Sequence, residues 1–141
     1  MMWLPLLLAL GAPPQCAVNG LLPDAACTPG ATIRISTSSL CTTKTSERRN
    51  MPASVRKRVF AEYGITPDAQ AYEVDHLISL ELGGSNDVTN LWPEAYPAAH
   101  DKDRLENTLH RQVCAGTMAL DYAQHVISTD WVSEYHKEFG P

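Results

Sequence analysis

The chain has 141 residues, a hydrophobic content of 44% and a formal net charge of -5. This length and composition predict one compact domain. The acidic balance argues against a general nucleic-acid coating protein, because such a protein needs a broad excess of positive charge.

The first twelve residues differ from the rest of the chain. Residues 3–10 form an apolar run that is too short to span a bilayer as a helix. Ala9-Leu10-Gly11 then supplies the small residues that a signal peptidase prefers, although no Lys or Arg precedes Arg34. We expect residues 1–12 to be a signal peptide and the protein to be secreted or periplasmic. An ordinary buried N-terminus is the alternative.

Residues 13–50 are expected to form an extended, poorly ordered segment. Their first half is rich in Pro, Gly, Ala and Asn and shows no period. Ala31–Ser36 alternates and is β-branched, which predicts one short strand. Residues 36–50 are dominated by Ser, Thr and charge, so we expect a loop there.

The four cysteines form no CxxC pair, which excludes the usual zinc-knuckle pattern. In an exported protein, scattered cysteines more often form disulfides than bind metal. Cys41 and Cys114 are the preferred pair, and Cys16 with Cys27 could close a small N-terminal loop.

Positive charge is concentrated before and within one predicted helix. Pro52 begins this helix and Gly64 ends it. Such a cluster could contact phosphates, or it could be a solvated helix face. Its members are Lys44, Arg48, Arg49, Arg56, Lys57 and Arg58, of which Arg56, Lys57 and Arg58 are the candidate nucleic-acid contacts.

A hairpin region is predicted over residues 70–93, with Asp75-His76 on its first strand. Adjacent strand residues point to opposite faces, so both side chains serve one site only where the strand ends or is distorted. A carboxylate can hold a divalent cation while a neutral imidazole activates water. Gly83-Gly84 allows a tight reversal, and Asn90 could lock the loop that aims His76.

Helices are predicted for the rest of the chain. Residues 101–113 place Leu105, Leu109 and Val113 on one face, and Gly116 stops this helix. A further apolar stripe continues to the end, with a bend near Thr129-Asp130; its members are Leu120, Ala123, Ile127, Trp131 and Tyr135.

Val74-Asp75-His76-Leu77-Ile78, Gly83-Gly84, Asn90-Leu91-Trp92-Pro93 and the helix that follows resemble the HNH endonucleases of the His-Me finger (ββα-metal) group. The resemblance covers residues 71–115 at motif level. It implies an α+β fold in which a small ββα-metal core and flanking helices occupy residues 51–141.

The resemblance also implies roles for single residues. His76 would be the general base, Asp75 would ligate Mg²⁺, and Asn90 would match the central asparagine of the motif. Mn²⁺, Zn²⁺ and Ni²⁺ are alternatives to Mg²⁺. The last ligand should come from the helix. His110, which shares a helix face with Glu106, is favoured over His100.

Glu106 would assist His110 or orient it, and Lys102 on the same face could neutralise phosphate charge. The alternative for Glu106 is an exposed charge that pairs with Lys102 or Arg111. A disulfide between Cys41 and Cys114 could brace the hairpin in place of cysteine knuckles.

The expected function is therefore metal-dependent hydrolysis of phosphodiester bonds in nucleic acid, with DNA as the expected substrate. No separate DNA-reading domain is visible in the sequence, so phosphate and shape contacts would set specificity. A catalytically inactive HNH-like module is the main alternative, and a different metal-assisted hydrolase is a third.

Overall fold

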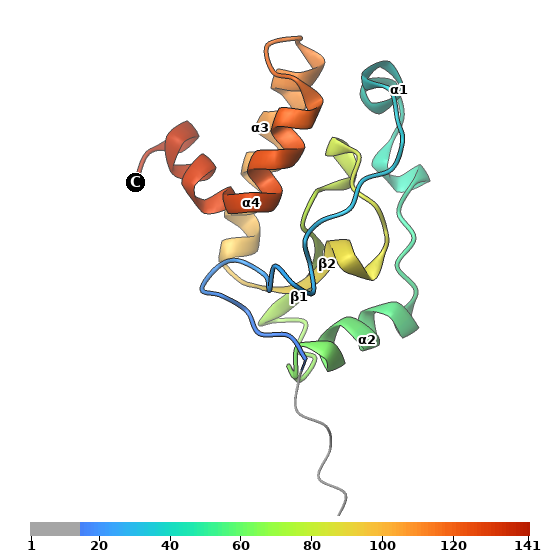
Figure 1. Ribbon diagram of the computed structural model, residues 1–141, viewed down its shortest axis with the longest axis vertical. Helices are drawn as coiled ribbons and strands as arrows, with labels where there is room; N and C mark the ends of the chain where they lie inside the picture. The colour runs from blue at the N-terminus through green and yellow to red at the C-terminus, as the bar shows by residue number, and fades with distance from the viewer. Residues whose placement is uncertain (1–14) are drawn as a thin grey trace, which may run out of the picture.

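The computed structural model describes residues 15–141, so the signal peptide expected at residues 1–12 lies outside the described residues. The described chain is an α+β protein with four α-helices and a two-stranded antiparallel hairpin. The hairpin lies between α2 on one side and the packed helices α3 and α4 on the other (Figure 1). The elements are α1 (Thr37–Thr42), η1 (Thr45–Glu47), α2 (Ala53–Glu62), β1 (Tyr72–His76), η2 (Leu80–Leu82), η3 (Val88–Asn90), β2 (Leu91–Ala95), α3 (Ala98–Cys114) and α4 (Leu120–Phe139), where η denotes a 3-10 helix.

The register of the hairpin concentrates acidic side chains. Glu73 lies opposite Glu94, and His76 lies opposite Leu91. Directly opposed side chains lie close together, and alternate residues of one strand share a face. Two carboxylates therefore meet across the hairpin, with Asp75 two residues further along β1. His76 ends β1, which is the position where Asp75 and His76 can serve one site.

Residues 77–90 join the strands through a long loop rather than the tight turn expected at Gly83-Gly84. The loop contains η2 and η3, and Gly83 ends η2 in the left-handed region at φ +81°. Gly84 is required for a different reason. A Cβ on this residue would lie 1.7 Å from the carbonyl oxygen of Ile78, so no side chain fits there.

The main core lies between α3, α4 and the loop. It contains the apolar positions that the helical periodicity predicted, namely Leu105, Leu109 and Val113 of α3 and Ala123, Ile127 and Trp131 of α4. The α3 helix begins at Ala98 rather than Asp101, which places His100 in its first turn. The expected bend in α4 is present at Asp130, whose carboxylate accepts a 3.1 Å hydrogen bond from the Ser133 backbone N–H and caps the second half.

The segment before α2 is more structured than the sequence predicted. Residues 36–50 contain α1 and η1 rather than a continuous loop, and the Ser36 side chain caps α1. Residues 31–36 do not form a strand, because only Thr32 pairs there, through a single bridge to Gly84. An alternating run becomes a strand only when a partner edge extends beside it.

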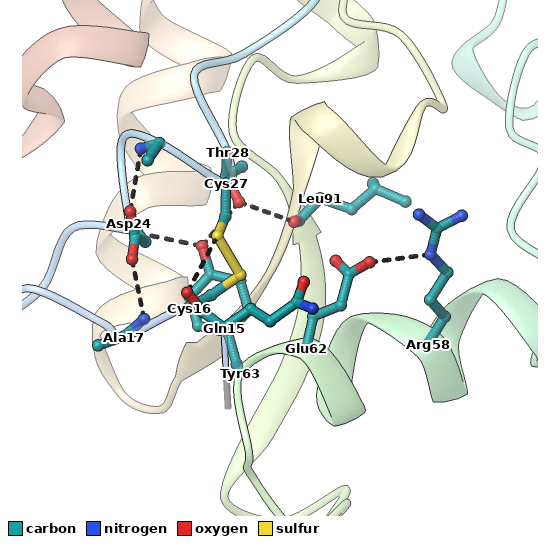
Figure 2. The surroundings of a disulfide bond; sticks show 11 residues. Gln15, Cys16, Ala17, Asp24, Cys27, Thr28, Arg58, Glu62, Tyr63 and Leu91 are labelled. Atoms are coloured by element: carbon teal, nitrogen blue, oxygen red, sulfur yellow. Dashed lines mark hydrogen bonds and ion pairs between the residues drawn. A yellow bond between two sulfur atoms is a disulfide. The ribbon is translucent and has the colours of Figure 1, made fainter. Parts of the chain in front are cut away.

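Residues 15–30 pack onto the hairpin and α2 (Figure 2). The hydroxyl of buried Thr28 lies 2.7 Å from the hydroxyl of Tyr63 and donates to the Leu91 carbonyl at 3.2 Å. The Asp24 backbone N–H donates to the same Tyr63 hydroxyl at 3.1 Å. The N-terminal segment is thereby attached to the end of α2 and to β2.

Two disulfides, Cys16–Cys27 and Cys41–Cys114, match the expected pairings. The second disulfide joins α1 to the last residue of α3, so it holds the C-terminal end of α3 against α1. Within residues 15–141, no helix is both long and apolar enough to cross a membrane.

Candidate functional site

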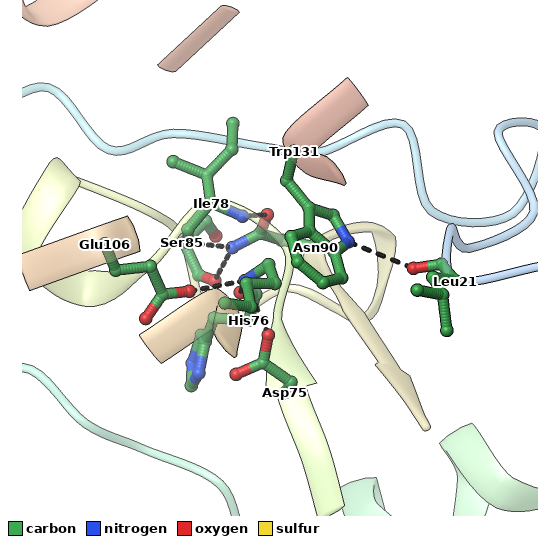
Figure 3. Close-up of polar contacts among 9 residues, drawn as sticks. Leu21, Asp75, His76, Ile78, Ser85, Asn90, Glu106 and Trp131 are labelled. Carbon is green, nitrogen blue, oxygen red and sulfur yellow. Dashed lines mark hydrogen bonds and ion pairs between the residues drawn. The ribbon is translucent and has the colours of Figure 1, made fainter. Parts of the chain in front are cut away.

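Carboxylates from β1, β2 and α3 meet at the end of β1. Oxygen atoms of Asp75, Asp103 and Glu106 lie within 4.8 Å of one another, and so do oxygen atoms of Glu73, Asp75 and Glu94. Asp75 belongs to both groups. Figure 3 shows Asp75, His76 and Glu106 gathered at this position, with Asn90 beside them. The carboxylate cluster is the name used below for the five acidic residues Glu73, Asp75, Glu94, Asp103 and Glu106.

Lys102 lies inside the carboxylate cluster and is fully buried. Its ammonium donates to Asp75 Oδ2 at 2.7 Å and to the His76 carbonyl at 2.9 Å, and it also bonds to Glu106. Burial alone lowers the pKa of Lys102, but the charges of Asp75, Glu106 and Glu94 outweigh it and hold the pKa above its usual value. Lys102 therefore stays charged.

This position of Lys102 corrects two expectations. Lys102 is not available to neutralise a phosphate at the surface, because the hairpin covers its helix face. Glu106 does pair with Lys102, but as a buried group rather than an exposed one. Burial raises the pKa of Glu106, and the Lys102 ammonium opposes that shift.

Glu94 is the most unusual member of the carboxylate cluster. It is 1% exposed, and its carboxyl oxygens accept no hydrogen bond from residues 15–141, although a protonated Glu94 can donate to the Asp75 carboxylate. Burial, together with the nearby Asp75 charge, raises the pKa of Glu94 to about 10. A buried carboxylate without a partner is costly, so Glu94 needs a bound proton or a cation.

His76 is held by a network that defines its tautomer. Its Nε2 lies 3.0 Å from Asn86 Oδ1. The orientation of the Asn86 amide is set by two further contacts, because its Nδ2 donates to the Arg48 carbonyl at 2.7 Å and its Oδ1 accepts from the Asn50 N–H at 3.1 Å. Nε2 of His76 must therefore carry the hydrogen, which leaves Nδ1 as the proton acceptor.

Burial lowers the pKa of His76, although the Asn86 hydrogen bond acts in the opposite direction. The ring is therefore neutral at pH 7. In the sequence, an asparagine at position 86 indicates only a turn, so this contact with His76 was not predicted. The one available signal was the position of Asn86 in the loop between His76, which ends β1, and Asn90, which directly precedes β2.

Asn90 fixes the loop from within. It is fully buried, and its amide donates to the carbonyls of Ile78 at 2.9 Å and Ser85 at 2.8 Å. Its oxygen accepts from the Ile78 N–H at 2.9 Å. These contacts span the loop from one end to the other, in keeping with the locking role expected for Asn90. The side-chain oxygen and nitrogen of Asn90 are therefore both engaged inside the loop.

The two histidines considered as helix ligands do not join the carboxylate cluster. His110 Nδ1 lies 2.7 Å from the Glu81 carbonyl oxygen, and the exposed His100 ring packs against Tyr96 at 4.9 Å between centroids. Within residues 15–141, neither belongs to a group of potential metal ligands. The preference for His110 over His100 finds no support, and Asp103 joins Asp75 and Glu106 instead.

The predicted phosphate contacts on α2 separate into two kinds. Arg56 and Lys57 line surface cavities beside the hairpin. Arg58 does not line them, and its Nε donates to the Glu62 carboxylate at 2.9 Å. Arg49, just before α2, lines a cavity shared with Asp103 and a second one beside Arg56.

Comparison of the chain with protein-family models, with curated proteins and with solved structures found no match. The residues of the site are therefore the basis for the function proposed below.

Proposed function

We propose that this protein is a metal-dependent endonuclease that hydrolyses phosphodiester bonds in nucleic acid, with DNA as the expected substrate. The observation that carries the proposal is the geometry at the end of β1. A neutral His76 imidazole with Nδ1 free to accept a proton lies next to Asp75, a member of the carboxylate cluster. A base beside a cation site is an arrangement that can hydrolyse a phosphodiester.

The residues of the carboxylate cluster fit a hard divalent cation. Glu94 has two buried oxygens without partners, and only one buried ammonium, Lys102, offsets the five acidic groups among the described residues. A set of carboxylate oxygens favours Mg²⁺ or Mn²⁺ over Zn²⁺ or Ni²⁺, which bind better to imidazole and thiolate. Asp75 would hold the ion, with Asp103 and Glu106 or with Glu73 and Glu94.

A bound divalent cation would supply Lewis-acid stabilisation of the phosphate charge. The other parts of the reaction fall to this chain's own residues. Nδ1 of His76 takes the proton of the attacking water, and Asn86 holds the ring in the required tautomer. Asn90 holds the loop that places Asn86. In this proposal β1, β2 and α3 form the ββα-metal core that the sequence motif suggests.

The disulfides favour an oxidising compartment, so we also propose that the protein acts outside the cytoplasm. In that setting the substrate would be extracellular or periplasmic nucleic acid. Phosphate contacts, rather than base reading, would set the affinity, since the candidate contacts that line the cavities on α2 are the charged side chains of Arg56 and Lys57.

The test is cleavage of supercoiled plasmid by the oxidised protein with Mg²⁺ or Mn²⁺. We expect nicking by the wild type, and a loss of at least about 100-fold in rate for His76→Ala and Asp75→Asn. His125→Ala and Asp121→Asn are matched controls, because both side chains are exposed on α4 and should leave the rate unchanged. Supercoiled plasmid and single-stranded circular DNA both left intact by the wild type with either metal at pH 6 to 9 would refute the nuclease proposal.

One observation favours a second candidate, a module that binds metal or nucleic acid without cleaving it. Lys102 already compensates part of the charge on Asp75 and Glu106. If the wild type binds Mn²⁺ and DNA but cleaves neither plasmid nor single-stranded DNA, this second candidate replaces the first.

A further inference from the structure

Two adjoining cavities run along α2 beside the hairpin. The larger has a volume of about 450 Å³ and includes Arg49, Tyr72 and Tyr96 in its lining. The smaller, about 330 Å³, adds Lys57, and the two share Arg56. We call the surface formed by these five residues the α2 groove. Its larger cavity falls within the size range of small-ligand pockets.

The α2 groove borders the carboxylate cluster on two sides. Glu73 lines the larger cavity and also belongs to the cluster. Arg49 lines the groove and a further cavity of about 270 Å³, whose lining includes Asp103 and Glu106. A chain molecule lying in the groove would therefore reach the candidate site at the end of β1.

The cations of the α2 groove are free to bind a ligand. Arg49, Arg56 and Lys57 are exposed, and within residues 15–141 none of them takes part in a salt bridge. Two acidic residues, Asp68 and Glu73, also line the larger cavity. Three cations without a salt-bridge partner in one groove can bind the negative charges of a nucleic-acid backbone.

The aromatic side chains of the α2 groove are held in place. The Tyr72 ring meets Phe60 edge-on, with 6.5 Å between the ring centroids. The Tyr96 hydroxyl donates to Glu73 at 2.8 Å, and its backbone N–H donates to the Ala71 carbonyl at 3.0 Å. Rings fixed in this way lose little freedom when a flat group packs against them.

We infer that the α2 groove binds an unpaired nucleic-acid strand, with backbone phosphates on Arg49, Arg56 and Lys57 and one nucleobase in the larger cavity against Tyr72 and Tyr96. The inference rests on the proposed function and specifies its substrate. A base enters such a cavity only when it is unstacked, and aromatic side chains beside cations are what single-strand sites use. A duplex would present its phosphates but would keep its bases out of the cavity.

The test measures binding by fluorescence anisotropy with EDTA present, so that no cleavage occurs. The ligands are a labelled oligothymidine, the same sequence as a duplex, and an abasic oligomer of equal charge. We expect the oligothymidine to bind about tenfold more tightly than either of the other two. Equal or tighter binding of the duplex, or equal binding of the abasic oligomer, would overturn the inference.

Two variants of α2 distinguish binding in the α2 groove from attraction to positive charge in general. Arg56→Ala should weaken oligothymidine binding about fivefold or more and reduce the slope of log K against log salt concentration by about 0.7. Arg58→Ala removes the same charge two residues away but outside the groove, so it should change affinity less than twofold. Equal effects of the two variants would overturn the assignment of the groove.

The ring of Tyr96 is tested separately. Tyr96→Phe keeps the ring and should bind like the wild type, whereas Tyr96→Leu should bind about tenfold more weakly. Failure of the groove inference can be distinguished from failure of the proposed function. Groove-dependent binding without cleavage of either single-stranded DNA or plasmid would refute the nuclease, and cleavage of single strands that is insensitive to Arg56→Ala would refute only the groove.

Discussion

The Lys102 ammonium lies 2.7 Å from Oδ2 of Asp75, in a position with no solvent exposure. The candidate metal ligand is therefore already paired with a cation. A divalent ion at this site would bind the carboxylate oxygens that make no hydrogen bond to Lys102. The positive charge of Lys102 would weaken the affinity of the site for that ion.

Lys102→Met should be strongly destabilising. It removes the one buried cation described in the carboxylate cluster and leaves Asp75 and Glu106 uncompensated, so we expect a loss of about 3–5 kcal/mol in the free energy of unfolding. Urea denaturation measures it. Lys137→Met is the matched control, because Lys137 is exposed and lies 3.9 Å from Glu134; its loss should stay below about 1 kcal/mol.

Added Mn²⁺ should restore part of the stability of Lys102→Met and should stabilise this variant more than the wild type, because a second cation can replace the missing charge. Equal stabilisation of both proteins would show that Lys102 and the metal do not share ligands.

Glu94→Gln should change the pH dependence of stability. The pKa of Glu94 is about 10 in the folded protein against an ordinary value of 4.5. The folded state keeps a proton that the unfolded state releases, so the wild type loses stability as the pH rises from about 5 towards 10. Glutamine carries no such proton. The variant should therefore gain at least about 1 kcal/mol relative to the wild type between pH 5 and pH 8.

Unfolding in urea at the two pH values measures this difference. The exposed Glu47→Gln should show no comparable change between pH 5 and pH 8. A stability difference between Glu94→Gln and the wild type that is the same at both pH values would contradict the raised pKa of Glu94.

Cleavage should fall in acid with a midpoint below the ordinary histidine pKa of 6.5. His76 must be neutral to accept a proton, and burial lowers its pKa.

Asn86→Ala should reduce the cleavage rate about 10- to 100-fold with little change in KM, since the His76 ring would no longer be held in one orientation and Asn86 does not contact the substrate. The measurement is the rate of plasmid nicking from pH 5 to pH 9. An acidic midpoint above 6.5 would remove His76 as the base.

The two disulfides should contribute unequally. Cys41–Cys114 spans 73 residues and Cys16–Cys27 spans 11, and a longer closed loop restricts the unfolded chain more. Replacing both Cys41 and Cys114 by Ser should lower the free energy of unfolding by about 2–4 kcal/mol. The same change at Cys16 and Cys27 should cost less. The reverse order in urea denaturation would show that local packing outweighs the chain-entropy effect.

The helices could be predicted from the sequence because they carry local signals. Pro52 and Gly64 bound α2, and the spacing of Leu105, Leu109 and Val113 defines the buried face of α3. The strand predicted for residues 31–36 is wrong. Alternating β-branched residues favour extended backbone, but they do not supply the neighbouring strand that a sheet needs.

The candidate site was predictable only in part. Asp75 and His76 stand together in a recognisable motif, but the burial of Lys102 depends on how α3 packs across the hairpin, which no local pattern encodes. His110 lies one turn beyond Glu106 and contacts the Glu81 carbonyl instead of the cluster. Glu94 was missed because it follows Trp92-Pro93, a stretch that indicates packing and the end of a strand.

Gly84 sets a limit on how far this sequence can vary. Gly116 and Gly20 have positive φ but open space around them, so asparagine is a tolerable substitute at those turns. At position 84 the obstacle is the Ile78 carbonyl itself, which even an alanine methyl group would overlap. In a saturation library selected only for correct folding, we expect position 84 to return glycine alone, while positions 20 and 116 return several residues.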